Sequence, residues 1–150
     1  MEAGMKTFVP VRDLLHGGRL LSEEEIRQLS PNTLAFIGDA VFELYVRLKV
    51  LNDGRKPADK LNREKAEIVN AGAQAALLKR IDARLTEEEK TIVRRGRNAK
   101  HHTTAKNQTI QDYNQATGLE ALCAFLYLGG HTERLTELLA YGFSEPVLMA

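Results

Sequence analysis

Residues 30–51 read SPNTLAFIGDAVFELYVRLKVL, and this stretch decides the fold class. Ser30 followed by Pro31 is typical of a helix start, because a serine side chain caps free backbone N–H groups and proline fits the first turn. Apolar residues then recur at steps of three and four, the spacing of one helix face. They are Leu34, Ile37, Val41, Leu44 and Leu48. The stretch predicts a long helix that ends before Asn52-Asp53-Gly54.

The rest of the chain also divides into helix-sized pieces. Two capping boxes, Ser22 with Glu25 and Thr86 with Glu89, predict helix starts. Residues 60–85 are rich in helix-forming types, with Val69, Ala73, Ala76 and Leu77 on one face, and indicate one long helix or a broken pair. Further helices are expected from Thr86 toward Arg94, stopped by Gly96; from about Gln111 to Leu128, stopped by Gly129-Gly130; and from Thr132 to Tyr141, stopped by Gly142. Without any alternating strand pattern, the expected fold class is all-α.

Length and composition favour a folded globular protein. The 150 residues suffice for one core, so we expect one domain over 1–150, with 1–30 as an N-terminal extension. A hydrophobic content of 43% is too high for intrinsic disorder. The single cysteine, Cys123, lies in an apolar run and is expected to be a buried, reduced thiol. The chain has neither a signal-peptide pattern nor a membrane-spanning run, which favours a cytoplasmic protein.

Asp39 is the first candidate for chemistry. It lies on the helix of residues 34–51, where Phe36, Ala40, Val46 and Val50 make the face opposite the main stripe apolar as well. A carboxylate among apolar neighbours costs free energy unless it is paired or binds a metal. The simpler interpretation is a salt-bridged row in which Asp39 and Glu43 face Arg47 at four-residue steps.

Glu120 is the second candidate. Its neighbours on the same helix face are small or apolar, with no other charge. A solvent-facing glutamate is the simpler interpretation, but these neighbours argue against full exposure. If Asp39 and Glu120 meet in space, they offer a site for a hard divalent cation such as magnesium, which accepts one or two carboxylates and keeps several waters.

The third feature is the basic stretch RRGRNAKHHTTAKN, residues 94–107, because no acidic residue occurs from 94 to 111. Such a stretch can neutralise phosphates and hydrogen-bond ribose oxygens, although a solvated loop is the simpler interpretation. The candidate RNA-binding residues are Arg94, Arg95, Arg97, Asn98, Lys100, Thr103, Thr104, Lys106 and Asn107. His101 and His102 are expected to be polar contacts, since no third metal ligand is suitably spaced. No aromatic residue interleaves these cations, so duplex recognition fits better than base stacking.

Three motifs resemble a known family. AFIGDAVFELYVR, residues 35–47, resembles the signature helix of ribonuclease III, and ATGLEALCAFLYL, residues 116–128, resembles that family's later helix with a catalytic glutamate. RGRNAK at 95–100 and TTAKN at 103–107 are similar to Mini-ribonuclease III, the branch without a separate double-stranded-RNA-binding domain. The resemblance covers roughly residues 31–129, which is most of the chain.

The resemblance implies an all-helical ribonuclease III-like endonuclease domain. It implies magnesium-dependent hydrolysis of double-stranded RNA, with manganese able to substitute, and a precursor of 23S ribosomal RNA as substrate. Asp39 and Glu120 would be the catalytic residues and metal ligands, with Glu43 in a supporting role. The family also implies a symmetric homodimer without a nucleotide cofactor. Ala35 and Thr117 stand where full-length ribonuclease III enzymes carry two more acidic residues, which implies a reduced metal shell.

Two other functions remain open from the residues alone. One is a non-catalytic helical RNA-binding or ribosome-associated module, in which the basic stretch binds RNA and both carboxylates are structural. The other is a protein-interaction domain that dimerises through its apolar helix. Incubation with long duplex RNA, with and without magnesium, separates all three.

Overall fold

The computed structural model describes residues 21–99 and 109–148, the last five of these as backbone only. Every regular element in these two ranges is helical, so the all-α prediction is confirmed. The helices are α2 (Glu23–Arg27), α3 (Pro31–Asn52), α4 (Ala58–Val69), α5 (Ala71–Ile81), α6 (Glu87–Arg97), α7 (Ile110–Leu128) and α8 (Thr132–Leu148), with a short 3₁₀ turn, η2 (Asp82–Arg84), after α5. None of these helices has the length and apolar character needed to span a membrane.

The predicted helix starts are confirmed at atomic detail. The Ser22 hydroxyl accepts the Glu25 backbone N–H at 3.0 Å, and the Glu25 side chain accepts the Ser22 N–H in return. Thr86 and Glu89 form the same capping box at the start of α6. Ser30 caps α3 by accepting the backbone N–H of Thr33. Local sequence therefore sets where these helices begin.

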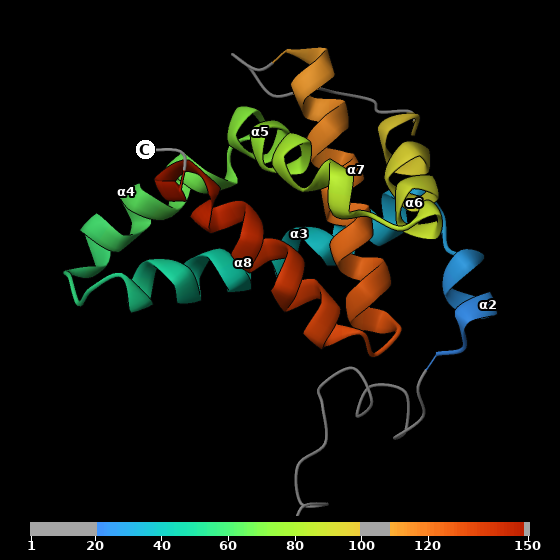
Figure 1. The fold of residues 1–150 in the computed structure, drawn as a ribbon, viewed down its shortest axis with the longest axis horizontal. Helices are drawn as coiled ribbons and strands as arrows, with labels where there is room; N and C mark the ends of the chain where they lie inside the picture. The colour runs from blue at the N-terminus through green and yellow to red at the C-terminus, as the bar shows by residue number, and fades with distance from the viewer. Residues whose placement is uncertain (1–20, 100–108, 149–150) are drawn as a thin grey trace, which may run out of the picture.

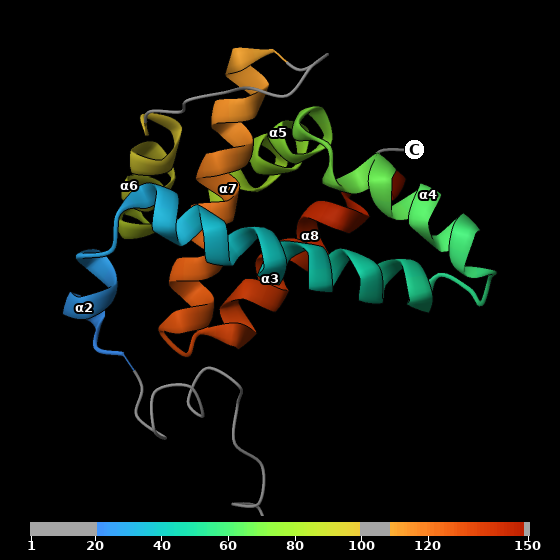
Figure 2. The ribbon, with the colours of Figure 1, turned by 180° about the vertical axis from the view of Figure 1, so that it is seen from behind.

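Helix α7 is the centre of the core. Its residues from Ala116 to Leu126 are all buried apart from Glu120, and Cys123 among them is fully buried, as predicted. Helices α3, α5 and α6 each pack against α7, and Figures 1 and 2 show them on different sides of it. Figure 2 shows α3 crossing α7. At the end of α7, Gly130 has a φ of 83°, a conformation that favours glycine.

Residues 60–85 form the broken pair rather than one helix. Asn70 ends α4 in an extended conformation and caps α5, since its side chain accepts the backbone N–H of Ala73 at 2.8 Å. On α5, Leu77 is buried and Ala76 is only partly buried, although the sequence placed both on one face.

Two glycines that were predicted to stop helices lie inside them instead. A Cβ on Gly96 would lie 2.8 Å from the Gly118 Cα, so the glycine lets α6 approach α7 closely. Similarly, a Cβ on Gly142 would lie 2.2 Å from a Leu77 methyl carbon, where α8 meets α5. The predicted ends at these two positions were wrong because helix packing, rather than chain termination, requires glycine there.

The side of α3 that faces the core does not coincide with the apolar stripe seen in the sequence. Within that stripe Leu34 and Val41 are buried, but Leu44 and Leu48 are 56% and 48% exposed. Val46 and Val50, assigned to the opposite face, are fully or almost fully buried. A helix that is apolar all round does not reveal which of its sides faces the core.

Candidate active site

The two candidate carboxylates meet in a cleft between α3 and α7. Asp39 comes from the first half of α3 and Glu120 from the middle of α7. The cleft has a volume of about 220 Å³ and is open to solvent. It is lined by Asn32, Ala35, Phe36, Asp39, Tyr113, Thr117 and Glu120. The structure thus brings together two side chains that lie far apart in the sequence.

Gly38, directly before Asp39, explains how the helices come so close. A Cβ at this position would lie 1.6 Å from the Glu120 carbonyl oxygen and 2.4 Å from its carbonyl carbon. Only glycine permits the backbone of α3 to rest against that of α7 at this point. The Gly38-Asp39 pair therefore fixes the helix crossing and supplies the first carboxylate.

Glu120 has an unusual electrostatic environment. Burial raises its pKa to about 7, and the nearby Asp39 carboxylate adds to the shift. A hydrogen bond from the Gln74 side chain, with Nε2 3.3 Å from Oε2 of Glu120, acts in the opposite direction. Two carboxylates that repel each other in a partly buried cleft are stabilised by a bound cation.

The cleft fits a divalent cation with few protein ligands. Ala35 and Thr117 both line it, so the positions that are acidic in longer relatives of the resembled family are neutral here. The Thr117 hydroxyl donates to the backbone oxygen of Tyr113 at 3.0 Å. Among the residues that the structure describes, no three or more Asp, Glu, His or Cys side chains are placed so that together they could hold a metal ion. An ion held by Asp39 and Glu120 would complete its shell with water and substrate oxygens, as magnesium commonly does.

Glu43 does not line this cleft. Its carboxylate accepts hydrogen bonds from Arg47, with Nε at 2.8 Å, and lies 3.4 Å from Lys65 Nζ of α4. The Arg47 hydrogen bond lowers the pKa of Glu43. Of the salt-bridged row considered for Asp39, Glu43 and Arg47, the structure forms the Glu43–Arg47 pair, and Asp39 instead faces Glu120. Any supporting role of Glu43 would therefore come from its ion pair with Lys65, which connects α3 to α4.

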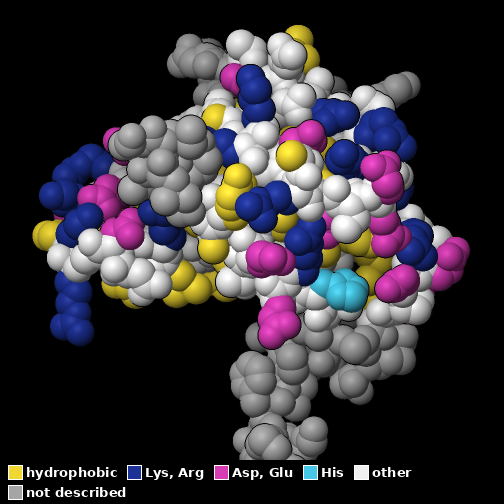
Figure 3. Space-filling model, viewed as in Figure 1, with side chains coloured by type: hydrophobic (Ala, Val, Ile, Leu, Met, Phe, Trp, Pro, Cys, Tyr) yellow, Lys and Arg dark blue, Asp and Glu magenta, His cyan; other side chains and the backbone are white. Residues whose placement is uncertain are grey.

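The described basic residues lie at the C-terminal end of α6. Arg94 and Asn98 are exposed, and Figure 3 shows Lys and Arg side chains over this end of the helix, at the upper right. Arg95 is half-buried and donates to the backbone oxygens of Arg27 and Leu29 at 3.5 and 3.4 Å. Lys100, Thr103, Thr104, Lys106 and Asn107, with His101 and His102, fall outside the described residues.

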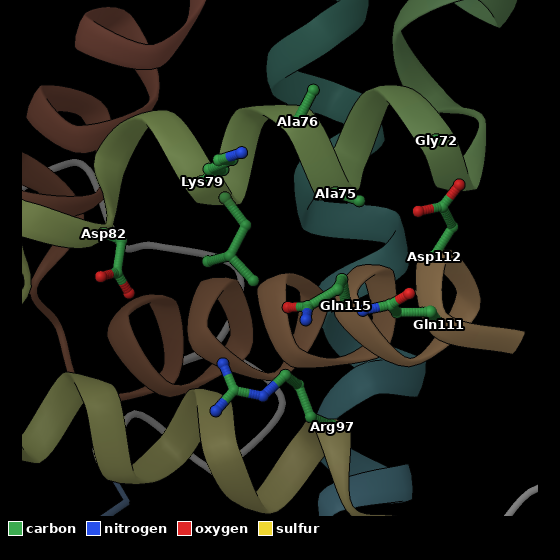
Figure 4. Close-up of a pocket in the computed structure, with 10 residues that line it drawn as sticks. Gly72, Ala75, Ala76, Lys79, Asp82, Arg97, Gln111, Asp112 and Gln115 are labelled. Carbon is green, nitrogen blue, oxygen red and sulfur yellow. The ribbon is translucent and has the colours of Figure 1, made fainter.

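Arg97 lies at a second hollow of about 580 Å³, beside α5 and the start of α7. Lys79, Gln111 and Gln115 also line this hollow, and Figure 4 shows the last two on α7 with Arg97 reaching up from α6. None of its lining residues belongs to the Asp39–Glu120 cleft. Arg95 and Arg97 therefore face different surroundings, although the sequence grouped them together.

Helix α3 also presents an unpartnered apolar face. Phe36 is 77% exposed, and it lines the cleft beside Asp39. Leu44, Leu48 and Leu51 continue the row along α3. We call these four residues the α3 apolar face. Apart from Ile110, they are the exposed large hydrophobic residues of the described chain.

Gln74 is a residue of the site that the sequence interpretation missed. It is 3% exposed and contacts Glu120 from α5. A signal was present, because Gln74 occupies the first position of the spacing Gln74, Leu77, Leu78, Ile81, which is otherwise apolar. A polar residue on a buried helix face needs a hydrogen-bond partner, and that partner can be a functional side chain.

Comparisons with known proteins show what the chain is similar to. The family model described as Ribonuclease III domain matches residues 32–131, which contain both carboxylates. A protein of Thermoanaerobacter sp. strain X514 named Mini-ribonuclease 3 is 50% identical over 139 residues, covering 93% of this chain and 94% of that protein. Another of that name, from Symbiobacterium thermophilum, is 46% identical and covers 74% of this chain and 85% of its own length. A crystal structure of a Fusobacterium nucleatum protein matches with a TM-score of 0.72 and 34% identity, over 81% of this chain and 98% of that one.

Proposed function

The chain belongs to the ribonuclease III family and resembles Mini-ribonuclease 3 proteins over most of their length, and from this membership we propose how it acts. It is an endoribonuclease that hydrolyses phosphodiester bonds in double-stranded RNA, with Asp39 and Glu120 as its catalytic residues. The observation that carries this assignment is the meeting of these two carboxylates in an open cleft, where the two family motifs cross.

The family is generally metal-dependent, and we propose magnesium as the ion, with manganese able to substitute. Asp39 and Glu120 would hold it from opposite sides of the helix crossing. Bound there, the ion supplies Lewis acidity toward a phosphate oxygen and lowers the pKa of a coordinated water. The exposed Asp39 carboxylate would face the incoming phosphodiester, and the partly buried Glu120 carboxylate would anchor the site. No covalent bond between protein and RNA is required.

We propose that the basic end of α6 and the segment after it bind the RNA backbone. Arg94 and Asn98 are exposed there. The proposed RNA-binding set is Arg94, Arg95, Arg97, Asn98, Lys100, Thr103, Thr104, Lys106 and Asn107. Cations neutralise phosphates, while threonine and asparagine side chains suit ribose and phosphate oxygens. The proposed substrate is the double-stranded end of a 23S ribosomal RNA precursor, which would place the enzyme in the bacterial cytoplasm.

We also propose that the enzyme is a homodimer formed through the α3 apolar face. In a monomer this face exposes apolar surface to water, which costs free energy, whereas a self-complementary interface would bury it. The residues concerned are Phe36, Leu44, Leu48 and Leu51. Because Phe36 lines the cleft beside Asp39, such an interface would lie next to the site. Two copies would offer two sites for the two strands of a duplex.

The decisive experiment incubates the purified protein with long duplex RNA in the presence of magnesium or of EDTA. We expect shorter duplex products with magnesium and intact RNA with EDTA. Single-stranded RNA of the same sequence and duplex DNA serve as controls and should stay intact. Magnesium-independent binding without cleavage would favour the non-catalytic RNA-binding module, and weak, unselective binding would favour the interaction domain.

A further inference from the structure

Gln74 lies at the point where α5 meets the candidate active site. Its helix face is otherwise apolar, since Leu77, Leu78 and Ile81 are 2%, 3% and 0% exposed. Gln74 itself is 3% exposed. Burial of a primary amide costs free energy unless its polar atoms are paired, so an apolar residue would serve the core better here. The amide therefore requires a reason beyond packing.

The partner of this amide is Glu120. Nε2 of Gln74 donates to Oε2 of Glu120 across 3.3 Å, joining residues on α5 and α7 that are far apart in the sequence. An amide N–H donates to a carboxylate, so this contact favours the ionised form that binds a cation. It also ties down one of the two oxygens of Glu120, which limits rotation of the carboxylate about its last bond.

The other carboxylate of the site is held differently. Asp39 is exposed on α3, whereas Glu120 lies against apolar neighbours on α7. Hydrogen-bond partners that orient ligand side chains typically change metal affinity about 10- to 100-fold when removed. Gln74 is a hydrogen-bond partner of this kind for Glu120.

We propose that Gln74 is a positioning residue, which holds the Glu120 carboxylate in the orientation that receives the divalent cation. The proposal rests on the function proposed above, because it assumes that Glu120 is a metal ligand. It adds a third helix, α5, to the active site. A purely structural glutamine would instead only satisfy its own amide, and its removal would change stability without changing metal affinity.

The test uses the Gln74→Met variant of the full chain. Methionine is close to glutamine in length and suits a buried helix face, but it has no N–H to donate. Leu78→Met is the matched control, since Leu78 is equally buried one turn further along α5. Gln74→Asn is the second variant, which keeps an amide but shortens its reach by one methylene. Thermal melting without metal establishes that each variant is folded.

The primary readout is Mn²⁺ affinity in the absence of RNA, measured by electron paramagnetic resonance of the free ion. We expect Gln74→Met and Gln74→Asn to weaken Mn²⁺ binding at least about tenfold, with Leu78→Met equal to wild type. In cleavage assays, kcat at limiting metal should fall, excess metal should partly restore it, and KM for duplex RNA should stay unchanged.

The outcomes separate this inference from the function on which it rests. If wild type neither binds Mn²⁺ nor cleaves duplex RNA, the proposed function fails. If wild type does both, and both folded Gln74 variants match it in Mn²⁺ affinity and kcat, then Gln74 is not a positioning residue. A loss equal to that of Leu78→Met would have the same meaning, since it would report only a disturbed core.

Discussion

Gly38 of α3 lies directly against the backbone of Glu120 of α7, so close that a Cβ on Gly38 would stand 1.6 Å from the Glu120 carbonyl oxygen. The neighbour is backbone, which cannot rotate away as a side chain could. Any side chain at position 38 must therefore separate the helices that bring Asp39 and Glu120 together.

Gly38→Ala should consequently damage both stability and activity. Overpacking of this kind typically costs about 1–3 kcal/mol, and a clash with backbone belongs at the upper end of that range or beyond it. Urea unfolding and a cleavage assay measure the two effects. The control is Gly72→Ala, also within a helix, where a Cβ would meet only ordinary contacts at 3.5 and 3.6 Å. Equal stability of the two variants would contradict the close crossing.

Asp39→Asn and Glu120→Gln should each abolish cleavage while duplex binding persists. Each change removes an anionic oxygen at nearly constant volume, and loss of metal-assisted charge stabilisation corresponds to roughly 100-fold or more in kcat. Single-turnover cleavage and RNA binding in calcium report the two steps. Asp53→Asn, at the far end of α3, is the control, since Asp53 pairs with Lys49 away from the cleft. Turnover near that of wild type in either active-site variant would refute the assignment.

The stability of the metal-free protein should report the environment of Glu120. The pKa of Glu120 is raised from its ordinary value of 4.5 to about 7 in the folded protein, chiefly by burial. The unfolded chain releases this proton at lower pH, so folding is penalised increasingly as the pH rises from about 4.5 to 7. Wild type and Glu120→Gln should thus have equal free energies of unfolding near pH 4. Above pH 7 the variant should be more stable, by on the order of 3 kcal/mol.

Urea unfolding in EDTA from pH 4 to 8 gives these curves, and parallel profiles would be inconsistent with a raised pKa. Glu43→Gln offers a contrast of opposite sign. Because the Arg47 hydrogen bond lowers the pKa of Glu43, that variant should lose stability at neutral pH and not at low pH.

The α3 apolar face should control the oligomeric state. Leu44→Glu combined with Leu48→Glu places charges on two exposed positions, so the protomer should stay folded while self-association is lost. Sedimentation equilibrium at micromolar concentration should show a dimer for wild type and a monomer for the double variant. Ile110→Glu, an exposed apolar residue outside α3, should remain dimeric. A monomeric wild type would remove the dimer proposal.

Replacement of Arg95, Arg97 and Lys100 together by alanine should weaken duplex binding and flatten its salt dependence. Each lost phosphate contact reduces the slope of log K against log salt by roughly one. The Arg95 guanidinium also bonds the turn before α3, so a melting curve is needed to confirm folding. Lys90→Ala, at the other end of α6, is the control. If the affinity and the salt slope were unchanged, the phosphate contacts would have to be made by other residues.

Much of the fold was predictable because its signals are local. Ser22, Ser30 and Thr86 form caps with residues three positions away, so the sequence alone contains both partners. The helix ends predicted at Gly96 and Gly142 were wrong for the opposite reason. The residues that these glycines contact, Gly118 and Leu77, lie on other helices. A glycine inside a helix and a glycine after one look alike until the packing is known.

The site shows the same division. Asp39 and Glu120 stood out as carboxylates among apolar residues, which is a local pattern. Their approach, and the contact from Gln74, depend on how α3, α5 and α7 pack, and the sequence carries no direct measure of that. Leu44 and Leu48 belong to the predicted apolar stripe of α3 but are exposed, because α3 is apolar on every side and only the packing decides which side stays outside.

The order of the active-site residues along the chain has a consequence for its synthesis. Asp39 precedes Gln74, and Glu120 comes only on α7, near the end of the described chain. A nascent polypeptide therefore has only one of the two carboxylates of the proposed site until α7 has left the ribosomal exit tunnel. If the proposed site is the nuclease centre, a nascent chain cannot cleave RNA before α7 has been synthesised and has packed against α3.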